Sequence, residues 1–170
     1  MRIVLAAALA GLLLPLLVPA QKLELKLDSL AAKAKEKAEV DLEGSALEAA
    51  LKAGQLGRKM PHALTAVHVR NYQFSKPGEY SDSDLAPLRG QLGEGSGWSR
   101  IVQVKEPHES AEIFVLAQAG EFRGLLVVAC EPAEVSVVHL AGVLAPEQVK
   151  ELVTSNIRYD LTNLPLPAPR

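Results

Sequence analysis

The sequence predicts an α+β domain in which an antiparallel sheet of about five strands carries helices packed on one face. Two observations predict this class. From Trp98 to Val143, apolar residues follow a period of two in four runs joined by short turns with Pro or Gly, which is typical of an antiparallel meander. Earlier in the chain, and again after Ala145, apolar residues recur at helical spacing instead.

The start of the chain has the pattern of a secretory signal peptide. A basic residue precedes an apolar run from Ile3 to Val18, and Val18 and Ala20 stand where a signal peptidase reads small residues. The run is about 16 residues long and contains Pro15, whereas a spanning helix needs roughly 20 residues. We therefore expect cleavage after Ala20 and export to the periplasm or the cell exterior; an uncleaved anchor is the alternative.

The expected organisation is a signal peptide over residues 1–20, a single α+β domain over residues 21–160 and an extended tail over residues 161–170. In the tail, prolines alternate with other residues and prevent regular packing. No second apolar stretch approaches spanning length, so no membrane span is expected after signal cleavage. A net charge of −2 without a concentrated basic patch argues against a nucleic-acid partner.

The single cysteine limits the chemistry of the chain. Cys130 is the only cysteine, so no intrachain disulfide can form even in an oxidising compartment. Because no cysteine follows the signal, lipid anchoring is not expected. Its apolar neighbours predict that Cys130 is a small buried residue rather than a reactive thiol.

Helices are predicted in the first half of the chain and at its end. Asp28 is the N-cap of a first helix, whose apolar face is formed by Leu27, Leu30, Ala31, Ala34 and Ala38. A second helix begins at Ser45 and stops at Gly54. A third runs through Leu85, Leu88 and Leu92, and Pro87 favours a cap at Ser83 or a kink. The last helix opens at Pro146.

Five strands are predicted around these helices. The first is Ala63–Phe74, and the meander consists of Trp98–Glu106, Ala111–Ala117, Glu121–Cys130 and Glu134–Val143. The last two strands are apolar on both faces, which places them in the centre of the sheet. A second layer, a bound partner or a dimer contact would supply the cover that such strands need.

His139 and His68 are the candidate residues for chemistry. Alternation places His139 among branched apolar residues, which predicts a neutral ring that is bonded to a carbonyl or a side chain. His68 is flanked on its own strand face by Ala66 and Arg70, and Arg70 would oppose protonation and repel a metal. The four histidines match no zinc spacing, so neither a metal nor another cofactor is expected.

Other residues that could form a site have simpler explanations. Arg70 and Tyr72 share a strand face, where they could form a recognition patch or pair with a neighbouring strand. Trp98 opens a strand and is predicted to be a core or edge anchor rather than a ligand platform. The glycine-rich segment Gly90–Gly97 follows a helix, the reverse of a phosphate-binding loop, and is read as a connection.

Four short segments resemble a known family. They are V-D-L at Val40–Leu42, Y-Q-F at Tyr72–Phe74, W-S-R-I-V at Trp98–Val102 and V-V-H-L-A-G-V-L at Val137–Leu144. With them, nearly all of the mature chain is similar to the bacterial exported family called domain of unknown function 4252. The resemblance implies a small exported protein, often a lipoprotein, with no assigned activity and no catalytic residues to transfer. It also implies asparagine where this chain has His139, an exchange that keeps hydrogen bonding and loses proton transfer.

These observations favour a non-enzymatic protein of the periplasm or cell exterior that binds a protein or an envelope component. Homo-oligomerisation is a further expectation that the strands with two apolar faces allow. Two alternatives stay open. One is a hydrolase-type enzyme assembled from His68, His139 and distant carboxylates, and the other is a carrier of an apolar ligand in a cavity under the sheet.

Overall fold

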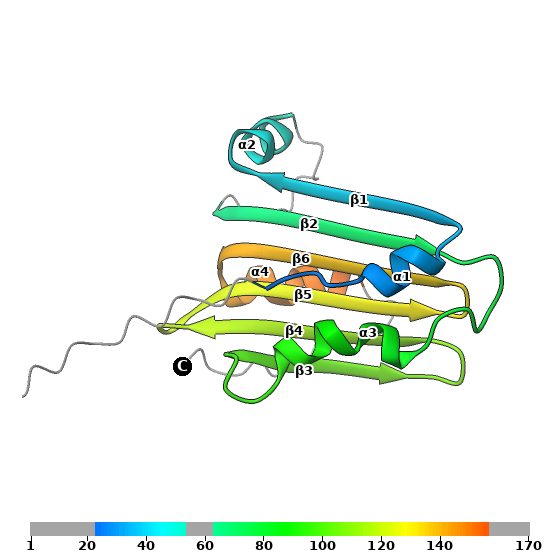
Figure 1. Cartoon of the computed structure of the whole chain (residues 1–170). Coiled ribbons are helices and arrows are strands. Elements are labelled where there is room, and N and C mark those ends of the chain that lie inside the picture. The colour runs from blue at the N-terminus through cyan, green and yellow to red at the C-terminus, as the bar shows by residue number, and fades with distance from the viewer. Residues whose placement is uncertain (1–22, 54–62, 157–170) are drawn as a thin grey trace, which may run out of the picture.

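The computed structural model describes residues 23–53 and 63–156, and the predicted signal peptide and tail lie outside these residues. Six strands form one antiparallel sheet in the order β1-β2-β6-β5-β4-β3 (Figure 1). The strands are β1 (Glu36–Glu43), β2 (Leu64–Gln73), β3 (Trp98–Lys105), β4 (Ser110–Gln118), β5 (Glu121–Glu131) and β6 (Glu134–Leu144). The α+β class and the C-terminal meander β3–β6 are confirmed.

The two strands that are apolar on both faces lie in the centre of the sheet, as predicted. β6 pairs with β2 on one side and with β5 on the other. Because each of these strands alternates between two covered faces, both faces contribute side chains to a buried cluster. Val135 and Val137 face one core cluster, while Leu140 and Leu144 of the same strand face the other.

Strand β1 was not among the predicted strands, and it corrects the first predicted helix. Helix α1 spans only Asp28–Lys33, and the chain is extended from Ala34 onward. The alanines at positions 31, 34 and 38 fit a helical face, but from Glu36 to Glu43 polar and apolar residues also alternate as in a strand. All eight β1 residues pair with β2, and this pairing stabilises the strand over the helix.

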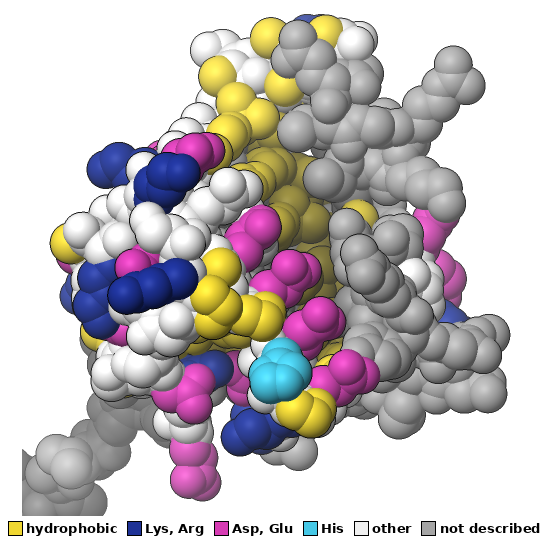
Figure 2. All heavy atoms as spheres, turned by 90° about the vertical axis from the view of Figure 1, so that its right-hand side faces the viewer, with side chains coloured by type: hydrophobic (Ala, Val, Ile, Leu, Met, Phe, Trp, Pro, Cys, Tyr) yellow, Lys and Arg dark blue, Asp and Glu magenta, His cyan; other side chains and the backbone are white. Residues whose placement is uncertain are grey.

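Helices cover both faces of the sheet, whereas the sequence predicted them on one face. Helices α1 and α3 (Asp82–Arg89) pack on the front face in Figure 1, and α4 (Pro146–Asn156) packs on the back. Helix α2 (Gly44–Lys52) adds Leu47 to the back cluster. The end-on view in Figure 2 shows apolar side chains gathered in a hollow beside a line of acidic side chains. The second layer therefore supplies most of the cover that the central strands need.

Helix α3 begins at Asp82 and its N-cap is Ser81, so the cap at Ser83, one of the two alternatives that Pro87 suggested, is not formed. A capping box joins Ser81 and Asp84, which satisfies backbone N–H groups that the first turn leaves without partners. Pro87 lies inside this short helix and is tolerated there. The Asp84 carboxylate also accepts hydrogen bonds from Ser29 and, at 2.7 and 2.8 Å, from the Lys33 Nζ of α1. Asp84 thus ties α1 to α3 above the front face.

Replacing Asp84 with asparagine is expected to lower the free energy of unfolding by about 2 kcal/mol, because Lys33 loses its charged partner at a buried site. Asp84 is only 5% exposed. Hydrogen bonds from Lys33 and Ser29 hold the pKa of Asp84 well below its usual range. Its contribution is therefore present at neutral pH and is lost as the pH falls below about 4. Urea unfolding of Asp84→Asn at several pH values measures this.

The matched control is Asp82→Asn, which removes an exposed carboxylate from the first turn of the same helix. Asp82 pairs with Arg89 at 3.1 Å at the surface, where an ion pair contributes at most about 1 kcal/mol. Equal losses in the two variants would contradict the assignment of Asp84 as the tie between α1 and α3.

Candidate functional site

The register of the sheet brings the two candidate histidines together. His68 of β2 lies directly opposite His139 of β6, and their rings stack with centroids 5.5 Å apart and planes 11° apart. Asp41 of β1 lies opposite His68 on the other side. A carboxylate and two imidazoles therefore follow one another across three neighbouring strands, although they are separated along the chain by 27 residues or more.

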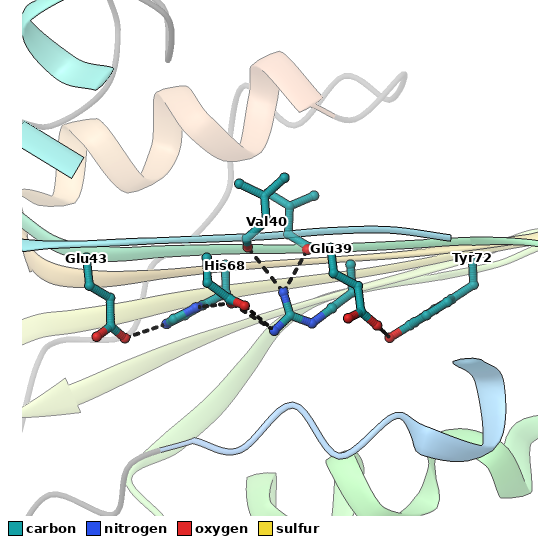
Figure 3. Close-up of polar contacts among 8 residues, drawn as sticks. Glu39, Val40, Glu43, His68 and Tyr72 are labelled. Carbon is teal, nitrogen blue, oxygen red and sulfur yellow. Dashed lines mark hydrogen bonds and ion pairs between the residues drawn. The ribbon is translucent and has the colours of Figure 1, made fainter. Parts of the chain in front are cut away.

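His68 is held by carboxylates at both ring nitrogens (Figure 3). Its Nδ1 lies 2.7 Å from Oδ1 of Asp41, and its Nε2 lies 3.3 Å from Oε1 of Glu43. Carboxylate oxygens only accept hydrogen bonds, so a ring nitrogen of His68 donates in each contact where it carries a hydrogen. Burial opposes ionisation of Asp41, but hydrogen bonds from Arg70 and His68 outweigh it and lower the Asp41 pKa.

Arg70 and Tyr72 form cross-strand pairs rather than a free recognition patch. The Arg70 Nη2 donates to both Asp41 oxygens at 2.8 and 2.9 Å, and its Nη1 donates to the Val40 carbonyl at 3.1 Å. The Tyr72 hydroxyl donates to Glu39 at 2.9 Å. Burial, then this hydrogen bond, raise the pKa of Tyr72 to about 12. These pairs fix the β1 carboxylates against β2 and orient His68.

His139 is buried, as predicted, with 7% of its surface exposed. Burial, and secondly the charge of His68, lower the pKa of His139 to about 4, so the ring is neutral at neutral pH. The expected hydrogen bond is not formed at Nδ1, which finds no partner among the described residues. A buried polar atom without a partner costs roughly 1–3 kcal/mol, and a molecule that bonds it recovers that cost.

A row of residues with small side chains at its centre forms a hollow beside the histidines. Two residues along the strands from Asp41, His68 and His139, one residue of each strand lies opposite its neighbours across all six strands. In sheet order these residues are Glu43, Ala66, Ala141, Gly124, Leu116 and Trp98. A Cβ at Gly124 would lie 2.9 Å from the Trp98 ring, so only glycine lets the indole lie over this strand. The centroid of the Trp98 ring lies 5.9 Å from the centroid of the His139 ring. Trp98 is a core anchor, as predicted, and also a wall of the hollow.

The hollow is a cleft of about 320 Å³, near the lower end of small-molecule sites. Its apolar lining consists of Leu23, Ala66, Trp98, Leu116 and Ala141. Its polar lining consists of Glu43, Thr65, His68, Gln118, Arg123 and His139. Arg123 is paired with Glu121 at 2.5 Å. The cleft therefore combines an apolar floor and wall with several hydrogen-bonding side chains.

A second surface lies on the back of the sheet. A row of branched residues crosses four strands and consists of Val40, Val69, Val138 and Val127. Val40 is 41% exposed, and the other three are partly buried against the back cluster. This row offers partly exposed apolar area but no side chain that could take part in catalysis.

The remaining candidate residues lie away from the cleft. Cys130 is buried, as predicted, and burial raises the pKa of its thiol. His108 lies in the turn between β3 and β4, and His62 lies outside the described residues. Within residues 23–53 and 63–156, no group of three or more potential ligands is arranged to hold a metal ion. None of the described helices is long and apolar enough to cross a membrane.

A comparison of the sequence with protein-family models identifies the family of this chain. A family model described as Domain of unknown function (DUF4252) matches residues 32–152, which include every strand. The chain belongs to this family. The predicted resemblance is thereby confirmed. No curated protein and no solved structure matches the chain.

Sequence reasoning missed three parts of the site in this DUF4252 domain: Glu43, the small floor and the contact between the histidines. Glu43 was missed because no strand was predicted between the helical face that ends at Ala38 and the helix that begins at Ser45. The floor has a signal in the sequence, since Ala66 and Ala141 are small residues on strand faces whose other positions carry larger side chains. Their alignment depends on strand order and register, which the alternation of one strand does not specify.

Proposed function

We propose that this DUF4252 domain is a non-enzymatic binding domain of the cell envelope and that the cleft beside His139 holds its ligand. The observation that carries the proposal is a buried, neutral histidine whose Nδ1 lacks a partner among the described residues and whose ring lines a preformed cleft. An envelope location is supported by the signal pattern of the first 20 residues.

The geometry supports binding better than acid–base chemistry at neutral pH. A general base needs a ring nitrogen that can accept a proton near neutral pH. Both nitrogens of His68 contact carboxylates, and the pKa of His139 is about 4. A neutral imidazole fixed in an apolar wall instead acts as a directional hydrogen-bonding group for a ligand.

Filling the cleft floor is expected to abolish ligand binding without unfolding the protein. Protein purified from the envelope fraction of cells is examined by native mass spectrometry, and two-dimensional NMR detects binding from a fragment mixture. Ala141→Leu places a larger side chain on the floor, whereas Ala38→Leu makes the same change on the exposed face of β1. We expect at least tenfold weaker binding in Ala141→Leu and no change in Ala38→Leu.

Failure of every fragment to shift the resonances of cleft residues would contradict the proposal. Equal loss of binding in the two variants would contradict it too, because the ligand would then lie elsewhere. A carrier of an apolar ligand is a special case of the proposal, in which the bound molecule lacks polar groups.

A hydrolase-type enzyme is the second candidate, because Asp41 and His68 form a 2.7 Å carboxylate–imidazole contact next to a cleft that Thr65 also lines. In that case Glu43 would have to release His68 before the ring could accept a proton. Turnover of p-nitrophenyl esters that is lost in both Asp41→Asn and His68→Asn would favour this function over simple binding.

A further inference from the structure

The charged side chains that line the cleft already have partners in the protein. Arg123 is paired with Glu121 at 2.5 Å, and Glu43 lies 3.3 Å from His68. His139 is neutral at neutral pH because of its burial. An ion entering the cleft would lose hydration and would meet side chains that already have partners, which disfavours a ligand with a net charge.

The polar groups of the cleft are suited to many weak, directional contacts. Gln118, Thr65 and the imidazole of His139 both donate and accept hydrogen bonds, and the carboxylate and guanidinium accept or donate several each. Such groups match a ligand that presents several hydroxyls, each of which donates one bond and accepts others. A purely apolar ligand would leave these groups without partners, at a cost for every group that it buries.

The apolar part of the cleft suits the C–H face of a saturated ring. Its floor consists of the alanines of β2 and β6, and its wall is the Trp98 indole with Leu116. Aromatic faces pack well against apolar C–H surfaces, and the size of about 320 Å³ is enough for a single sugar ring with substituents.

We infer that the ligand of the cleft is a neutral sugar residue of an envelope glycan, with its C–H face on the small floor and Trp98 and its hydroxyls on Gln118, Thr65 and His139. This inference rests on the proposed function and specifies the chemical class of its ligand.

The test uses methyl glycosides of glucose, galactose and N-acetylglucosamine at millimolar concentration, with butylammonium, butyrate and cyclohexane-methanol as comparison probes. Trp98 is the only tryptophan, so its fluorescence reports the cleft, and amide NMR shifts of residues 66, 124 and 141 locate the site. We expect at least one glycoside to bind there, with an affinity that changes less than twofold up to 0.5 M NaCl.

Two variants separate the specific contact from general damage. Gln118→Leu removes a hydrogen-bonding group from the cleft and is expected to weaken glycoside binding by about tenfold. Gln103→Leu makes the same change at an exposed position of β3 and is expected to have no effect. Binding that is unaffected by Gln118→Leu would overturn the hydroxyl contacts inferred here.

The outcomes for the two proposals differ. If butylammonium, butyrate or cyclohexane-methanol shifts the cleft resonances while no glycoside does, the sugar inference fails and the binding function stands. If no probe of any kind shifts them, both fail.

Discussion

Replacing Gly142 with alanine is expected to lower the free energy of unfolding by about 3 kcal/mol or more. A Cβ at this position would lie 2.3 Å from the Ala63 carbonyl oxygen and 2.7 Å from the Leu64 Cα. Neither contact can be relieved by a rotamer change, because both atoms belong to the backbone. Gly142 also has a φ of +139°, which side chains rarely adopt.

Two glycines serve as controls for Gly142→Ala. Gly78 has a φ of +84° and no atom within 4 Å of its Cβ position, so Gly78→Ala measures backbone strain alone. Gly90 has a φ of −60° and an equally open Cβ position, so Gly90→Ala is expected to be neutral or to stabilise by a few tenths of a kcal/mol. Urea unfolding compares the three variants. A loss for Gly142→Ala no larger than that for Gly78→Ala would show that the close backbone approach of β2 and β6 is wrong.

The pH dependence of stability is expected to report the burial of His139. The pKa of this ring is about 4 in the folded protein and near 6.5 when it is exposed to water. Between these values the unfolded chain binds a proton that the folded chain does not bind, so stability falls as the pH falls from 6.5 to 4. The full difference corresponds to about 3 kcal/mol, and no further loss from this group is expected below pH 4.

The His139→Asn variant isolates this contribution, because asparagine keeps hydrogen-bonding groups and does not titrate. Unfolding curves in urea at pH 7.5, 5.5 and 4.5 should show a smaller loss of stability in the variant than in the unchanged protein. His108→Asn, in the turn between β3 and β4, is the matched control and should keep the original pH dependence. Parallel pH profiles for His139→Asn and the unchanged protein would place His139 at the surface.

Local sequence patterns predicted most of the helices and strands, because these elements depend mainly on residues that are close together in the sequence. Alternation and turn residues identified β2 and the four strands of the meander, and the proline at the start of α4 marked that helix. The same reasoning failed for β1. Its residues satisfy a helical and a strand period at once, and only pairing with β2 stabilises the extended form.

The candidate site was predicted less completely, and the reason differs from residue to residue. The burial and neutral state of His139 follow from its neighbours on one strand, which are visible in the sequence. Its contact with His68 depends on β2 pairing with β6, which are more than 60 residues apart. The missing partner at Nδ1 depends on every side chain around the ring.

The sequence by itself therefore determined the α+β class, the antiparallel meander, the central position of β5 and β6 and the membership of the family. The tertiary structure alone decided that helices cover both faces, that two histidines stack and that two alanines of neighbouring strands align into a cleft floor. The physical reason is the distance along the chain between the residues that interact. Strand period and turn formation depend on residues within a few positions, whereas a cleft depends on register between strands that meet only when the whole sheet has formed.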